Sequence, residues 1–280
     1  MTYQENRILA VVDPTRVEQW SLSKALAVGK NRSNPKIFAY LCAYSETKCD
    51  DPERLRAVEI QRYGFWLKEI LAEYADAGVP IEPIVEWHAD WREGVCIAAD
   101  RTRSGLVIKR ASGDPGSLGN SDRRLIRGLE GSALFLVKRD PDMELKNVLI
   151  AIDLNATDKS HLALNETIMA LGKRIRGDAE GIQLHSISAY DKAEGFKHPP
   201  DIAKKLGISR AQAHVVQGSA ANVIPKMANN INADLVIVGN VSRRGLSGVA
   251  IGNTAEKILE DIESDVLVLV QDLESQPVAA

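Results

Sequence analysis

The chain has 280 residues and a formal net charge of −3, with 45% hydrophobic and 26% charged residues. This composition argues against intrinsic disorder, and the near balance of 35 basic and 38 acidic residues gives no overall attraction to nucleic acid or to anionic membranes. The length favours two domains, because domains usually contain roughly 100–200 residues.

The first half of the chain alternates short apolar runs with amphipathic stretches. Continuous apolar runs of this kind are typical of strands buried on both faces of a parallel sheet. Residues 77–80 end a long helical pattern with a glycine and then a proline, which is a common helix stop. We predict strands at 7–13, 36–44, 81–87, 105–109 and 133–138, and helices at 17–30, 52–76 and 92–103.

The second half repeats the first. Residues 7–13 and 147–153 both have the pattern of a buried strand ending in an aspartate, and these two aspartates, Asp13 and Asp153, lie 140 positions apart. Two more strand pairs recur in the same order, 105–109 with 234–238 and 132–140 with 264–272. We predict strands at 147–152, 182–188, 212–216, 234–238 and 265–270, and helices near 159–175, 198–205, 219–230 and 252–262.

Strands alternating with helices indicate an α/β protein with parallel, doubly wound sheets. The repeat indicates two tandem Rossmann-like domains, each a five-stranded sheet flanked by helices. A polar segment with a proline, residues 140–144, is typical of a linker. The predicted domains are therefore 1–140 and 145–280.

A glycine-rich segment follows the predicted strand at 234–238. It contains Gly239, Gly245, Gly248 and Gly252, and a helix is expected to begin directly afterwards at Asn253 or Thr254. Glycines let backbone N–H groups approach a ligand, and the free N–H groups of a helix N-terminus favour an anion. The segment matches neither a Walker A motif nor the Rossmann glycine motif. It is either a phosphate-binding loop or a glycine-rich connector with a helix cap.

The second half resembles the universal stress protein family, whose signature after the fourth strand is Gly-x2-Gly-x9-Gly-(Ser/Thr). The matching positions are Gly239, Ser242, Gly252 and Asn253, so serine stands at the second glycine and asparagine at the final hydroxyl position. The Gly-Asn-Thr-Ala-Glu run at 252–256 and the tandem layout are most similar to the two-domain bacterial members of E type. First-half segments at 77–81, 87–88 and 106–109 support the same resemblance.

The resemblance implies an adenine nucleotide alpha hydrolase-like fold that binds ATP, with Mg²⁺, across the strand ends. It implies an aspartate near adenine or ribose, a glycine close to the ligand, and a glycine loop around the phosphates. Two positions keep a structural alternative, because Asp153 can cap its own loop and Ser219 can cap the next helix. The implied binding residues are Asp153, Gly218, Gly239, Ser242, Gly252, Asn253 and Thr254.

The first half lacks most of this signature. Lys109 and Arg110 stand where the loop glycine is due, and no correctly spaced Gly-Asn or Gly-Ser helix start is recognised after them. We therefore expect a structural role for this half, as the partner in an internal pseudo-dimer. In the resembling family the fifth strand makes that contact, which corresponds here to residues 134–137 and 266–270.

We expect a stress-response protein without a committed catalytic step, in which the nucleotide is a regulatory ligand rather than an essential cofactor. A weak nucleotide hydrolase, or a protein that binds a lipid-like molecule or another metabolite, stays open as an alternative. The histidines and the three widely spaced cysteines show no metal-ligand spacing. We expect a cytoplasmic protein without direct nucleic acid or membrane partners, in which a homodimer of the whole chain stays open.

Overall fold

The computed structural model describes residues 4–43, 50–113, 118–178, 181–242 and 253–272. The chain divides into two compact units, Met1–Ala111 with Gly128–Asp142, and Ser112–Arg127 with Met143–Ala280. The second unit thus includes a segment that precedes the predicted linker. The predicted domain limits, 1–140 and 145–280, stay a prediction.

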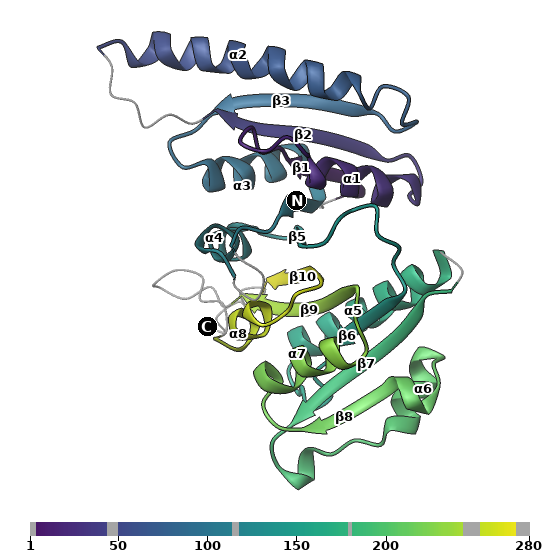
Figure 1. The fold of residues 1–280 in the computed structure, drawn as a ribbon. Coiled ribbons are helices and arrows are strands. Elements are labelled where there is room, and N and C mark those ends of the chain that lie inside the picture. The colour runs from purple at the N-terminus through teal and green to yellow at the C-terminus, as the bar shows by residue number, and fades with distance from the viewer. Residues whose placement is uncertain (1–3, 44–49, 114–117, 179–180, 243–252, 273–280) are drawn as a thin grey trace, which may run out of the picture. The chain divides into compact units, whose positions relative to one another are not determined.

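The first unit contains a five-stranded parallel sheet in the order β3-β2-β1-β4-β5 (Figure 1). Its central strands form because they are runs of apolar residues that are almost fully buried, such as Ile8, Leu9 and Ala10. The elements are β1 (Gln4–Val11), α1 (Trp20–Lys30), β2 (Lys36–Ala43), α2 (Pro52–Ala72), β3 (Ile81–Trp87), α3 (Trp91–Thr102), β4 (Ser104–Arg110) and β5 (Ala133–Val137).

The second unit also has a five-stranded sheet with parallel pairs. Read from the edge that corresponds to β3, its order is β8-β7-β6-β9-β10, which is the same order as in the first unit. The doubly wound α/β fold and its duplication are therefore confirmed. Its elements are β6 (Asn147–Ala151), α5 (Lys159–Asp178), β7 (Gln183–Tyr190), α6 (Pro199–Leu206), β8 (Ala213–Gln217), α7 (Ala220–Asn230), β9 (Leu235–Ser242), α8 (Asn253–Glu260) and β10 (Asp265–Asp272), with short 3-10 turns at Ala193–Gly195 and Arg210–Gln212.

A helix that is not predicted from the sequence, α4 (Asn120–Gly128), follows β4. It begins directly after Gly119, and a Cβ at Gly119 would lie only 2.6 Å from the Ser112 hydroxyl. Asp122 is fully buried, and its carboxylate accepts the backbone N–H of Ser112 at 2.8 Å. A Gly-Asn helix start therefore does follow β4, but after a shorter loop than its counterpart at Asn253, so it does not have the spacing of the family signature.

Local capping explains where the helices of the first unit begin. Asp51 precedes α2 and accepts the backbone N–H of Arg54 at 3.0 Å, and Asp90 precedes α3 and accepts that of Arg92 at 3.1 Å. The end of α2 lies at Ala72, four residues before the predicted end, because the chain continues in a series of turns. Within the described part of the chain, no helix is both long and apolar enough to cross a bilayer.

Candidate functional site

The candidate site lies at the carboxyl ends of the strands of the second sheet, where parallel α/β folds bind ligands. Asp153 follows β6, Gly218 follows β8, and Gly239 lies within β9, which pairs with β6. The strand β9 ends at Ser242. Asn253 and Thr254 open α8, as predicted, whereas Gly252 lies outside the described residues.

Asp153 is held by a network on its own loop. One carboxylate oxygen accepts the backbone N–H of Asn155 at 2.9 Å. Asn165 of α5 clamps the main chain, because its amide accepts from the Asp153 N–H at 3.0 Å and donates to the Asp153 carbonyl at 2.6 Å. The second carboxylate oxygen makes no hydrogen bond to any described residue, and the side chain is exposed. Asp153 therefore caps its turn and still presents an acceptor to solvent.

The first unit builds the same turn at Asp13. Its carboxylate accepts the backbone N–H of Thr15 at 2.9 Å. The side chain of Gln19 accepts from the Asp13 N–H at 3.1 Å and donates to the Asp13 carbonyl at 2.9 Å. Gln19 thus does for Asp13 what Asn165 does for Asp153, so the repeat extends to side-chain contacts.

Gly218 is required by the backbone at the start of α7. Its φ is +136°, a conformation that side chains disfavour, and a Cβ there would lie 2.9 Å from a methyl group of Val223. Ser219 is the N-cap residue of α7, but its hydroxyl makes no capping hydrogen bond. Among the described residues, the first N–H groups of α7 consequently lack a capping side chain, which suits an anionic ligand.

Gly239 has a packing role that is not predicted from the sequence. A Cβ at this position would lie 2.7 Å from Leu164 Cγ and 3.1 Å from Ile168 Cδ1, both on α5. The glycine therefore lets α5 approach the end of β9. This reason for glycine applies with or without a phosphate ligand.

Two further features of this edge were not expected from the sequence. Asn240, next to Gly239, is only 3% exposed, and its side-chain nitrogen has no hydrogen-bond partner among the described residues. On the loop after β7, the ring of Phe196 packs edge-on against Tyr190 and His198 at centroid distances of 5.7 and 5.6 Å, and Phe196 is 43% exposed. The only sequence signal for Asn240 is its position beside the loop glycine.

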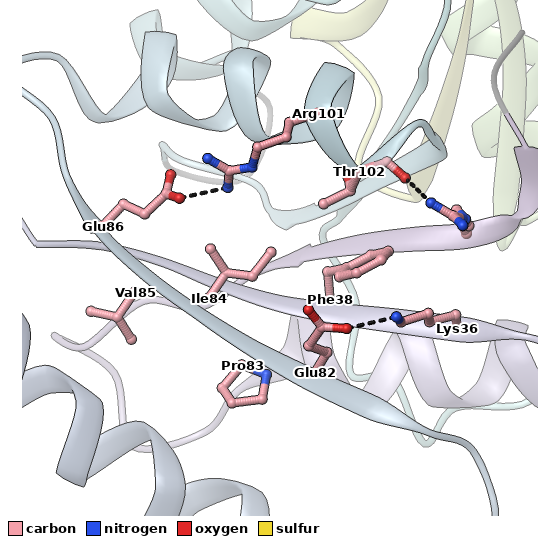
Figure 2. Close-up of a pocket in the computed structure, with 10 residues that line it drawn as sticks. Lys36, Phe38, Glu82, Pro83, Ile84, Val85, Glu86, Arg101 and Thr102 are labelled. Atoms are coloured by element: carbon pink, nitrogen blue, oxygen red, sulfur yellow. Dashed lines mark hydrogen bonds and ion pairs between the residues drawn. The ribbon is translucent and has the colours of Figure 1, made fainter.

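The first unit contains a groove of about 490 Å³ (Figure 2). Phe38 of β2 and Ile84 of β3 contribute to its apolar lining. Its charged side chains are largely engaged with each other. Lys36 pairs with Glu82 at 2.6 Å, and Arg101 pairs with Glu86 at 2.6 Å. None of the predicted binding residues lines this groove.

Two histidines on neighbouring strands of the second sheet form a hydrogen-bonded pair. Nδ1 of His185 lies 3.3 Å from Nε2 of His214, and the two rings are nearly parallel. Burial lowers the pKa of both imidazoles, and the neighbouring His214 lowers the pKa of His185 further. Across the described residues, no group of three or more His, Cys, Asp or Glu side chains is arranged to hold a metal ion.

We expect this pair to make the second unit sensitive to acid. Folding lowers the pKa of both histidines, so the unfolded chain binds more protons than the folded chain in mild acid. The free energy of unfolding is therefore highest above the unfolded pKa of about 6.5 and falls as the pH drops below that value. Urea unfolding at about pH 7.5 and about pH 5.5 measures the difference. His214→Gln should reduce the difference, whereas His198→Gln, at an exposed position, should leave it as in the wild type. An equal pH dependence for the wild type and His214→Gln would contradict the prediction.

Comparison with known proteins gives a consistent result. Residues 144–270 match the universal stress protein family. Universal stress protein E of Escherichia coli strain K12 is 27% identical over 97% of this chain and 96% of its own length. A solved structure from Pseudomonas aeruginosa covers 95% of this chain and 93% of its own, with a TM-score of 0.79 and 26% identity. A universal stress protein from Archaeoglobus fulgidus, at 17% identity and a TM-score of 0.72 over 96% of this chain and 99% of its own, has the same fold.

Proposed function

The chain belongs to the universal stress protein family, and we propose on this basis that its second half binds an adenine nucleotide, ATP with Mg²⁺, as a regulatory ligand. The protein acts in the stress response and carries out no committed catalytic step. The proposed binding residues are Asp153, Gly218, Gly239, Ser242, Gly252, Asn253 and Thr254.

The geometry of Asp153 is the observation that carries this proposal. Its carboxylate is oriented by the Asn155 N–H, its main chain is clamped by Asn165, and its second oxygen has no described partner. A carboxylate oriented in this way, at the end of a parallel strand, can accept hydrogen bonds from ribose hydroxyls without reorganising. The capping role and the ligand role therefore use different oxygens.

The phosphates are proposed to lie at the N-termini of α7 and α8. Ser219 leaves the first N–H groups of α7 uncapped, and α8 begins at the end of the glycine-rich segment. Helix N-termini carry a partial positive charge that stabilises phosphate oxygens. The first half lacks the loop glycine at the corresponding position, so we propose one nucleotide per chain. Pairing of the two halves through residues 134–137 and 266–270 stays a prediction.

Removal of the Asp153 carboxylate tests the site. We expect Asp153→Ala to weaken Mg-ATP binding about 10- to 100-fold, because a hydrogen bond to a charged group contributes about 1.5–3 kcal/mol. Titration calorimetry of the full-length chain measures the change. Gly252→Val, which adds a branched side chain to the proposed phosphate loop, should abolish binding.

Asp13→Ala is the matched control, because it removes the same turn from the first half. It should lower stability about as much as Asp153→Ala does and leave the affinity for Mg-ATP unchanged. Binding by Asp153→Ala that equals the wild type would place the ligand elsewhere. No measurable binding by the wild type would overturn the proposed function.

A further inference from the structure

Arg110 in the first half occupies the position that Gly239 has in the second. Leu-Val-Ile stands at 106–108 in the first half and at 235–237 in the second. Arg110 and Gly239 each lie two residues after this isoleucine, so they align. The strand registers agree, since Ile108 lies opposite Ala10 and Ile237 lies opposite Ile150. At the edge where the second half has a glycine, the first half therefore presents a guanidinium group.

The Arg110 guanidinium lies against an aromatic ring. Its central carbon is 3.6 Å from the centroid of the Trp20 ring. Arg110 is half-buried, and its side chain forms no hydrogen bond or ion pair with any residue that the structure describes. A guanidinium stacked on an indole keeps its N–H groups in its own plane, where they can form two parallel hydrogen bonds to an oxyanion.

The position of Trp20 is fixed by the turn at Asp13. Gln19, the residue before Trp20, is 4% exposed and is hydrogen-bonded to both the N–H and the carbonyl of Asp13. The indole N–H donates to the Glu18 carboxylate at 2.9 Å, so that carboxylate is already engaged. The aromatic support of Arg110 is consequently held in place before any ligand arrives, which lowers the entropic cost of binding.

A second cation lies beside Arg110 on the same strand. Lys109 is only 7% exposed, and its ammonium group donates to the Arg110 carbonyl at 2.7 Å. It also lies 5.7 Å from the ring centroid of Trp91, the first residue of α3. The end of β4 thus combines two cations with two tryptophans at the edge where α/β sheets bind ligands.

We propose that the first half binds an oxyanion, the phosphate or carboxylate group of a small molecule, through the guanidinium of Arg110. In this proposal the side-chain cation does in the first half what the glycine-rich segment is proposed to do in the second. Trp20 orients the guanidinium. This site is separate from the nucleotide site of the second half.

The distribution of tryptophan provides a selective readout. All of the protein's tryptophans, Trp20, Trp66, Trp87 and Trp91, lie in the first half, so intrinsic tryptophan fluorescence reports on that half alone. Sodium phosphate and sodium acetate are titrated separately into the full-length chain, against sodium chloride at matched ionic strength. We expect a saturable fluorescence change with phosphate, with acetate, or with both, and the responding anion distinguishes a phosphate from a carboxylate ligand.

Three variants test the role of Arg110. Arg110→Gln should remove the saturable change, and Arg110→Lys, which keeps the charge without the planar fork, should raise the midpoint at least several-fold. Arg56→Gln is the matched control, because Arg56 stacks on Trp87 at 3.7 Å in the same way but lies on α2. It should respond as the wild type does. Urea unfolding of each variant verifies that it is folded.

Several results would overturn the proposal. One is a wild-type fluorescence change with phosphate and acetate that is no larger than the change with chloride. The response of Arg110→Lys could equal that of the wild type, or Arg56→Gln could lose the response as well. Because the second half contains no tryptophan, each of these outcomes is independent of whether that half binds Mg-ATP.

Discussion

Replacing Gly239 with alanine is expected to lower the free energy of unfolding by about 1–3 kcal/mol, the usual cost of adding a methyl group to a packed core. The new Cβ would lie 2.7 Å from Leu164 Cγ and 3.1 Å from Ile168 Cδ1. Leu164 and Ile168 are 6% and 1% exposed, so neither side chain can move into solvent without losing buried contacts. Urea unfolding of the full-length chain measures the loss.

A matched substitution separates this packing effect from a general effect of alanine. Gly64 lies in α2, and an added methyl group there would have no described atom within 4 Å, so Gly64→Ala should raise stability by about 0.5–1 kcal/mol. In a Leu164→Ala background, Gly239→Ala should cost much less, because the space it needs has been vacated. An unchanged unfolding midpoint for Gly239→Ala would show that α5 is not packed on this glycine.

Gly94→Ala is also expected to lower the free energy of unfolding by about 1–3 kcal/mol, although alanine normally favours a helix. Gly94 is buried in α3, and its new Cβ would lie 2.5 Å from the Tyr40 hydroxyl oxygen and 3.1 Å from His88 Cβ. Tyr40 is fully buried, so its ring has no room to withdraw. Urea unfolding again measures the change.

Tyr40→Phe provides the control for Gly94→Ala. Apart from the neighbouring Cys42 thiol, a weak hydrogen-bonding group, the Tyr40 hydroxyl has no partner in the described part of the chain, and burial raises the pKa of this phenol far above its usual value. Removing an unsatisfied buried hydroxyl should therefore stabilise the protein, by about 1 kcal/mol. In the Tyr40→Phe background Gly94→Ala should be less costly. If Gly94→Ala lowered the free energy of unfolding equally in the wild type and in Tyr40→Phe, the predicted clash with the Tyr40 hydroxyl would be contradicted.

The fold could be predicted from the sequence because its strands are continuous apolar runs. Ile8, Leu9, Val148 and Leu149 are fully buried, as the two-sided burial of parallel strands requires. The helix α4 could not be predicted in the same way. Its buried apolar side chains are mainly Leu125 and Ile126, which are too few to give a helical period.

The candidate site could be predicted only in part. The positions of Asp153 and Gly218 follow from the strand ends and the resemblance, but no sequence pattern marks the contact of Asp153 with Asn165 or the closeness of Gly218 to Val223. The family signature assigns Gly239 to the phosphates, whereas the structure shows that a Cβ at this position would collide with Leu164 of α5. No local pattern marks this contact, because helix-to-strand packing is decided by tertiary structure.

In the first half too, part of the candidate site could not be predicted from the sequence. In the sequence, Lys109 and Arg110 indicate only the loss of a glycine loop. The stacking of Arg110 on Trp20 joins the end of β4 to the start of α1, and the two residues are far apart in the chain. The sequence does not mark this contact, because only the tertiary fold brings the two residues together.

One half of the duplicated chain is proposed to hold the nucleotide. The most direct test is the stoichiometry of Mg-ATP binding to the full-length wild type, measured by titration calorimetry with an independently determined protein concentration. We expect one nucleotide per chain for the wild type, and no nucleotide for Gly252→Val. Two nucleotides per chain, or none, would contradict it.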